Sequence, residues 1–321
     1  MSAGHLVLVV GVGRSGTSLL SGILGQLGFA IPQPEVQADE TNPRGFGEPR
    51  WVVDFHSRVL KEKRVTLNDS RPAAWEQMAL AAPAVHGELR EWLRGELAEA
   101  DEVVVKDPRT VWFLDLWRNC ADELGARTSF VTMLRHPAEI VASARKSYGP
   151  GLTEAGRAAA WINMMLQTEH ATRGTQRAFV SYYDLMADWV PEIRRLGTAL
   201  DVPRLAAVDH VPEVDAFVDP TLHRNRTTWD DLEVPAAVRD LAEKAWEHVQ
   251  AGDEAALDAD REAYVGLYRE AEAIAQCSIM AARPIRRAKA PAPKPPPTLR
   301  VRIARRIPAP YRRRLRRLVG K

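Results

Sequence analysis

The chain has 321 residues, of which 45% are hydrophobic and 27% charged, and its net charge is +2. This length and apolar content suffice to bury one large core or two small ones. Because no apolar run reaches 18 residues and two cysteines cannot form a disulfide framework, the composition excludes a membrane-spanning protein and a disulfide-stabilised secreted one. We expect a cytoplasmic protein.

The predicted strands and helices alternate along the chain. Apolar runs predict parallel strands, and apolar residues at helical spacing follow each of them. The strands are expected at residues 5–10, 102–107, 129–134 and 178–183, and the helices at 15–28, 72–100, after 107, from 137 and at 232–276. This order predicts an α/β fold in three layers, a parallel sheet flanked by helices.

The basic side chains are unevenly distributed. Residues 283–321 hold 15 of the 44 lysines and arginines, eight prolines and no acidic residue, whereas residues 1–282 hold 29 basic and 42 acidic side chains. A segment of that composition cannot bury a core. The sequence therefore predicts one domain over 1–282, followed by a Pro-rich linker and a disordered or partly helical basic amphipathic tail over 283–321.

The partner of this tail stays open at the level of sequence. Its apolar residues recur four apart between arginines, which suits peripheral association with an anionic membrane at its inner face, or with an acidic partner. A tail without a dedicated partner is the alternative. Specific binding of nucleic acid is not expected.

The loop after the first predicted strand matches two phosphate-binding motifs incompletely. Residues 11–16 read G-x-G-x-x-G, as in dinucleotide-binding proteins, but prolines within 28–36 disfavour the second strand that this motif requires. Residues 11–18 also fit the nucleoside-triphosphate motif G-x-x-x-x-G-K-[ST], except that Thr17 stands in place of the lysine. Neither a dinucleotide-dependent enzyme nor an ordinary kinase is favoured.

The loop keeps the physical properties of an anion site. The backbone N–H groups of residues 13–18 and the positive end of the next helix converge on one region. Hydroxyl groups add further donors, and Arg14 adds a full positive charge. The sequence therefore predicts a site for a phosphate-like group, built from Gly13, Arg14, Ser15, Gly16, Thr17 and Ser18.

A second motif follows the third predicted strand. Arg135 and Ser143 stand eight residues apart within the segment 133–149, where a strand passes into a helix, and together offer a charged fork and a hydroxyl donor. With the loop Arg14–Ser18, this pattern resembles the PAPS-dependent sulfotransferases, which use 3′-phosphoadenosine 5′-phosphosulfate (PAPS) as donor. The resemblance covers about residues 5–250 and implies a P-loop-like fold of the bacterial carbohydrate or glycolipid type.

The resemblance implies roles for the matching residues. In the family, the basic residue at the position of Arg14 contacts the oxygen that leaves with the 5′-phosphate, and residues like Arg135 and Ser143 bind the 3′-phosphate. Lys106 stands where small-molecule enzymes carry K-T-H, and would reach the sulfuryl oxygens.

Two weaker matches concern the nucleotide. The segment 181–189 resembles R-Y-E-D-L and would place Tyr182 near it, and the segment 219–226 would close over the donor through Arg224.

The small-molecule enzymes use the histidine of K-T-H as general base, but here Lys106 is followed by Asp107 and Pro108. Other branches of the family use a carboxylate from the segment after the first helix. Glu48, in the N-x-x-G-x-x-E run 42–48, is the first candidate, and Glu35, 21 residues after Arg14, is the second. For each of them the alternative is a surface carboxylate in a turn.

The predicted function is in-line transfer of a sulfuryl group from PAPS to a hydroxyl or amine of a carbohydrate, glycolipid or other small acceptor. The eight histidines show no ligand spacing, so no metal is expected; His56 is interpreted as a packing or substrate-lining residue and His136 as a strand-end or helix-cap residue. The alternatives are a catalytically silent nucleotide-binding protein and a nucleotide kinase. The acceptor and the oligomeric state cannot be deduced from the sequence.

Overall fold

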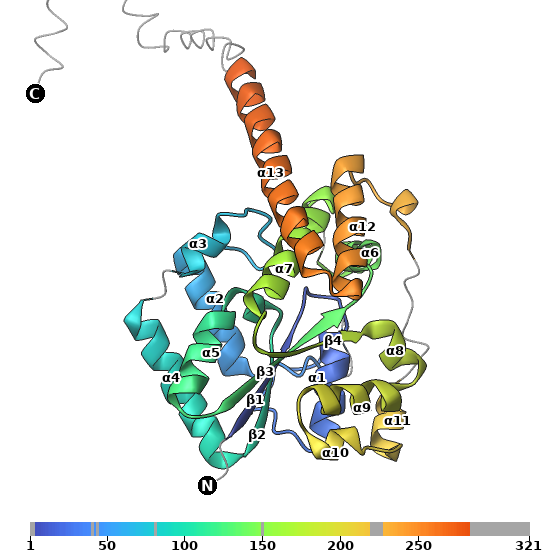
Figure 1. The fold of residues 1–321 in the computed structure, drawn as a ribbon. Coiled ribbons are helices and arrows are strands. Elements are labelled where there is room, and N and C mark those ends of the chain that lie inside the picture. Colours follow the sequence, from blue (N-terminus) through green and yellow to red (C-terminus); the bar gives the residue numbers. More distant parts are fainter. Residues whose placement is uncertain are drawn as a thin grey trace, which may run out of the picture. The chain divides into compact units, whose positions relative to one another are not determined.

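The structure is a computed structural model that describes residues 4–39, 42, 45–79, 82–148, 151–218 and 227–282 (Figure 1). The chain divides into two units, Met1–Glu270 and Ala271–Lys321. The unit up to Glu270 contains the sheet, both hydrophobic clusters and the site described below.

Four parallel strands form the sheet of the described chain, in the order β2-β1-β3-β4. In β1, Val9 pairs with Lys106 of β2 and with Val131 of β3, so these three strands end at the same edge. Polar residues at that edge therefore meet, as they do in other parallel sheets. The strands are β1 (His5–Val10), β2 (Glu102–Lys106), β3 (Arg127–Leu134) and β4 (Gln176–Ser181).

The helices connect the strands and cover the sheet. They are α1 (Thr17–Gln26), α2 (Arg50–Lys63), α3 (Ala74–Ala79), α4 (Pro83–Glu99), α5 (Leu114–Glu123), α6 (Pro137–Tyr148), α7 (Glu154–Ala171), α8 (Tyr182–Ala187), α9 (Trp189–Ala199), α10 (Pro203–Ala206), α11 (Pro212–Phe217), α12 (Ala236–Ala251) and α13 (Glu254–Ala282), with 3-10 turns η1 (Pro108–Trp112) and η4 (Trp229–Asp231).

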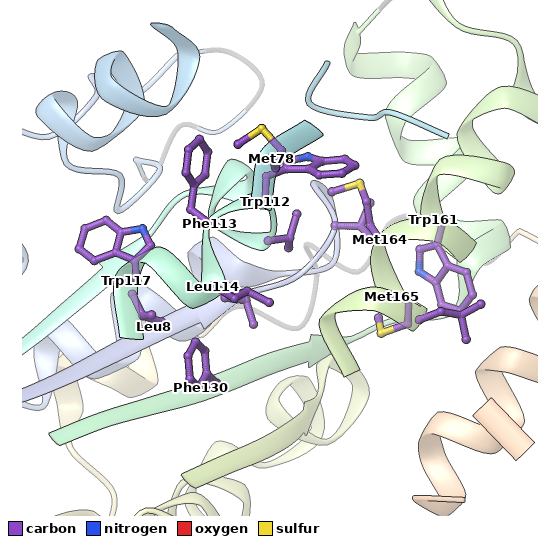
Figure 2. Packing of buried hydrophobic residues seen from close by; sticks show 14 of the residues in the cluster. Leu8, Met78, Trp112, Phe113, Leu114, Trp117, Phe130, Trp161, Met164 and Met165 are labelled. Carbon is purple, nitrogen blue, oxygen red and sulfur yellow. The ribbon is translucent and has the colours of Figure 1, made fainter. Parts of the chain in front are cut away.

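Alternate strand residues face opposite layers. Leu6 and Leu8 of β1 belong to one cluster, with residues of α2, α4, α5 and α7, and Figure 2 shows part of it around Trp112 and Phe130. Val7 and Val9 belong to a second cluster with residues of α1, α8 and α9. In Figure 1, α8 to α11 accordingly gather beside α1, away from α4 and α5. The predicted three-layer α/β fold is confirmed.

One strand boundary was predicted wrongly. The apolar run 178–183 suggests a strand through Tyr183, but β4 covers Gln176–Ser181 and α8 begins at Tyr182. The reason is a helix cap, because the Ser181 side chain accepts a hydrogen bond from the Asp184 N–H. None of the described helices combines the length and apolar character needed to span a membrane.

Candidate functional site

Residues 11–16, called the anion loop below after its predicted role, connect the end of β1 with the start of α1. Several of these residues have unusual backbone angles. Gly11, Arg14 and Gly16 have φ values of 147°, 77° and 99°. Glycine adopts such angles readily, whereas Arg14 is a non-glycine residue in the left-handed region, a conformation that concentrates at functional sites. The first N–H groups of α1 follow directly and lack helical acceptors of their own.

The loop contains a buried hydroxyl without a hydrogen-bond partner. The side chain of Ser15 is fully buried, and its Oγ bonds to none of the described residues. A buried polar group without a partner is costly unless a ligand or water satisfies it. A phosphate oxygen would accept a hydrogen bond from this hydroxyl, so the loop fits the group that its sequence predicts.

The two predicted phosphate motifs meet in space. Arg14 Nε donates to Ser143 Oγ of α6 at 3.1 Å, and Arg135, directly after β3, donates from its guanidinium to the Arg14 carbonyl at 3.2 Å. The residues of each pair lie more than 120 positions apart in the chain. The structure therefore brings together Arg14, Ser143 and Arg135.

Arg135 is fixed from two further directions. It is 7% exposed, its Nε donates to Glu139 Oε2 at 2.9 Å, and its guanidinium lies 4.4 Å from the centre of the Tyr182 ring. The Tyr182 ring also limits the loop, since a Cβ on Gly16 would come within 2.5 Å of it. Tyr182, at the start of α8, therefore contacts both Arg135 and the loop, and its predicted place near the nucleotide stays a prediction.

Lys106, the last residue of β2, has all three of its ammonium hydrogens engaged. Its Nζ donates to Ser18 Oγ at 3.0 Å, to the Phe46 carbonyl at 3.1 Å and to Glu48 Oε1 at 2.6 Å. The ion pair is buried, with 2% of the Lys106 side chain and 10% of the Glu48 side chain exposed. The first candidate base therefore contacts the predicted sulfuryl-binding lysine directly.

The two candidate bases have different surroundings. Burial raises the pKa of Glu48 above its usual range, and the neighbouring Lys106 offsets only part of that effect. Glu35 accepts a hydrogen bond from Gln33 Nε2 at 2.8 Å, in an exposed setting. It lines a depression of about 340 Å³ that also reaches Ser18. Glu48 is thus the better-placed carboxylate for accepting a proton beside Lys106.

Sequence reasoning missed a buried network behind Lys106. The ring of His56, on α2, donates from Nδ1 to Asp107 at 2.7 Å and accepts from Trp117 Nε1 at 3.0 Å. Trp117 can only donate, so His56 is neutral, and burial lowers its pKa accordingly. Burial also acts to raise the pKa of Asp107, but His56 and Arg109 hold it below its usual value.

This network fixes the turn after β2. Asp107 caps η1 by accepting from the Arg109 N–H, and the Arg109 side chain donates to the same oxygen at 2.7 Å. Asp followed by Pro at a strand end is a helix-start signal that was present in the sequence. Its partner His56 carried no local signal. Of the two interpretations of this histidine, packing or substrate lining, its complete burial favours packing.

Other predicted residues lie outside the site or outside the described chain. His136 accepts from the Ala138 N–H through Nδ1 and pairs with Glu243 through Nε2, as a helix cap does. Arg224 and the tail 283–321 lie outside the described residues. Among the residues that are described, no three His, Cys, Asp or Glu side chains gather as a metal-binding group.

Comparison with known protein families identifies the chain. A family model described as "Sulfotransferase family" matches residues 7–207, which include the anion loop, Lys106, Arg135 and Ser143. The chain belongs to the sulfotransferase family. Its activity is therefore the transfer of a sulfuryl group.

Solved structures similar to this sulfotransferase have low sequence identity. They include the sulfotransferase domain of the Synechococcus PCC 7002 olefin synthase (17% identity, TM-score 0.43, covering 78% of this chain and 95% of that one). The sulfotransferase domain of the curacin biosynthetic pathway has 15% identity, a TM-score of 0.44 and coverages of 78% and 99%. Sulfotransferase STF1 from Mycobacterium tuberculosis H37Rv has 16% identity, a TM-score of 0.39 and coverages of 76% and 76%. No curated protein matches the sequence.

Proposed function

We propose that this sulfotransferase uses PAPS as donor and transfers its sulfuryl group to a hydroxyl or amine of a carbohydrate, glycolipid or other small acceptor. The observation that carries the proposal is the contact between the two predicted phosphate sites. Arg14 and Ser143 are hydrogen-bonded, and Arg135 donates to the Arg14 backbone. A donor with phosphates at both 3′ and 5′ positions would fit two such sites side by side, whereas AMP would occupy one of them.

The proposed reaction is an in-line displacement at sulfur. By analogy with phosphoryl transfer, the bonds to the transferred group are loose and negative charge grows on the leaving oxygen. Arg14 stabilises that charge at the leaving oxygen, and Lys106 binds the oxygens of the sulfuryl group. The N–H groups of the loop hold the 5′-phosphate, and Arg135 with Ser143 holds the 3′-phosphate. Glu48 takes the proton of the acceptor hydroxyl.

Calorimetric binding of 3′-phosphoadenosine 5′-phosphate (PAP) tests the donor. We expect the wild type to bind PAP and to bind AMP and ATP·Mg much more weakly. Arg135→Ala removes a buried, charge-assisted contact, which costs about 2–5 kcal/mol, so PAP affinity falls by about 30-fold or more. Arg135→Lys keeps the charge without the fork and gives an intermediate loss.

The matched control is Arg127→Ala. Arg127 is the first residue of β3, whereas Arg135 follows its last residue, so this variant removes an arginine from the opposite end of the same strand. We expect it to keep PAP binding. Equal affinity for AMP, or preference for ATP·Mg, would contradict the proposal and favour a kinase. Tight PAP binding without turnover on a broad acceptor panel would favour a silent nucleotide-binding protein.

A further inference from the structure

Lys106 has no hydrogen left for a substrate. An ammonium group donates three hydrogen bonds, and those of Lys106 go to Ser18, Phe46 and Glu48. Only 2% of its side chain is exposed, so water does not offer a substitute. If Lys106 binds the sulfuryl group, as the proposed function requires, one of these three bonds must break.

We propose that the donor displaces Glu48 from Lys106, and that this exchange makes Glu48 available as the base. The inference rests on the proposed function and adds a coupling to it: the carboxylate can accept the acceptor's proton only after the donor is bound. The enzyme would therefore bind the donor first and the acceptor second.

Charge selects Glu48 as the partner that leaves. The sulfuryl group is anionic, and a carboxylate that shares one ammonium with it is repelled, whereas the Ser18 hydroxyl and the Phe46 carbonyl are neutral. Arg109 and Asp107 also act on the Glu48 carboxylate, with opposite signs, and they bond to each other. Because the effects of this arginine and this aspartate oppose each other, the additional repulsion that moves Glu48 comes from the anionic sulfuryl group of the donor.

The exchange needs only a side-chain movement. The Glu48 carbonyl accepts from the Val36 N–H at 2.8 Å, and the neighbouring Gly47 carbonyl accepts from Ser21 Oγ at 3.3 Å. A Cβ on Gly47 would lie 2.8 Å from that Oγ, so the loop packs closely on α1. With its backbone held, the Glu48 side chain can rotate while the loop stays in place.

The exchange also improves Glu48 as a base. Paired with Lys106, the carboxylate is stabilised in its charged form; without that cation, and still buried, it binds a proton more readily. The proton of the acceptor hydroxyl then passes to Glu48 as the new O–S bond forms. The S–O bond to the 5′-phosphate breaks, and its electron pair leaves with PAP.

The test compares PAPS with PAP, because PAP lacks the group that would compete for Lys106. Calorimetry is performed on the full chain without acceptor. In Glu48→Gln the competing charge is absent, so the dissociation constant of PAPS falls by about fivefold or more relative to that of PAP. Turnover falls by about 100-fold or more, because the base is lost.

Glu35→Gln is the matched control. It removes the same charge from the neighbouring segment, but Glu35 bonds to Gln33 rather than to Lys106. We expect its PAPS-to-PAP affinity ratio to change less than about twofold, which separates a specific exchange from general electrostatics. Glu48→Asp provides a second variant: it retains the charge but shortens the side chain, and should shift the ratio in the same direction as Glu48→Gln by a smaller factor.

The outcomes separate the two proposals. If Glu48→Gln binds PAP normally but binds PAPS no more tightly than the wild type, the exchange is overturned and the proposed function stands. If the wild type binds neither nucleotide, the proposed function itself fails. PAP binding by each variant also shows that it is folded.

Discussion

The anion loop can adopt its conformation only because Gly16 has no side chain. Its φ is 99°, and a Cβ at this position would lie 2.5 Å from the Tyr182 ring. That ring in turn lies over Arg135. A side chain at Gly16 would therefore disturb both predicted phosphate sites at once.

Gly16→Ala should lose PAP binding and lower the free energy of unfolding by about 1–2 kcal/mol, because the left-handed conformation alone costs this much. Urea denaturation and calorimetry measure the two effects. Gly87→Ala in α4 is the control, since nothing lies within 4 Å of its Cβ. Alanine is the better helix former, so we expect a gain of about 0.5–1 kcal/mol. Unchanged PAP affinity in Gly16→Ala would contradict this account.

At the scale of elements, β1 begins with a buried histidine that depends on its neutral form. His5 accepts from Arg127 at Nδ1 and bonds through Nε2 to Ser129, which in turn donates to Gln176. These bonds link β1, β3 and β4 at the start of the sheet. Burial and the charge of Arg127 lower the pKa of His5 to about 4.

This pKa predicts a loss of stability in mild acid. In the unfolded chain the pKa of His5 is near the ordinary histidine value of 6.5, so the folded state binds the proton more weakly. Its contribution is present above about pH 6.5 and is lost as the pH falls toward 4. Between pH 7 and 5 the expected loss is about 2 kcal/mol. Urea titrations of the wild type and of His5→Gln at the two pH values measure this loss. The free energy of unfolding of His5→Gln should fall by about 2 kcal/mol less than that of the wild type between pH 7 and 5. An equal fall in the two proteins would refute the role given to His5.

At the scale of the whole molecule, removing the tail, residues 283–321, shows where the folded domain ends. The sheet and both hydrophobic clusters lie within the unit Met1–Glu270. We therefore expect a chain that ends at Ala282 to keep the unfolding midpoint and the PAP affinity of the full chain. Loss of PAP binding in this truncation would mean that residues 283–321 contribute to the site.

The same two proteins test the proposed membrane role of the tail. Residues 283–321 carry 15 basic and no acidic side chains. Each basic residue near an anionic surface contributes about 1 kcal/mol to binding, so the full chain should co-sediment with phosphatidylserine vesicles and the truncated chain should not. Vesicles of phosphatidylcholine alone are the control. If the full and truncated chains co-sediment with phosphatidylserine vesicles to the same extent, the tail does not bind the membrane.

The sequence by itself determined the parallel α/β class of the fold, and two of its motifs predict phosphate sites. Strand runs, helix spacing and the glycines of the loop are local features, because each depends on a few neighbouring residues and their backbone preferences. Arg14, Arg135 and Ser143 were found in the same way, through two short motifs. Even the error at β4 was local, since the Ser181 cap was visible in the sequence but was outweighed by the apolar run.

Only the tertiary structure decided how the charges are paired. Lys106 and Glu48 are 58 positions apart, and the buried chain from Asp107 through His56 to Trp117 joins three separate elements. A charged side chain has many possible partners in a sequence, and the one it takes depends on which others burial brings within reach. The fold placed the candidate base Glu48 in contact with Lys106, and no local pattern could have shown that.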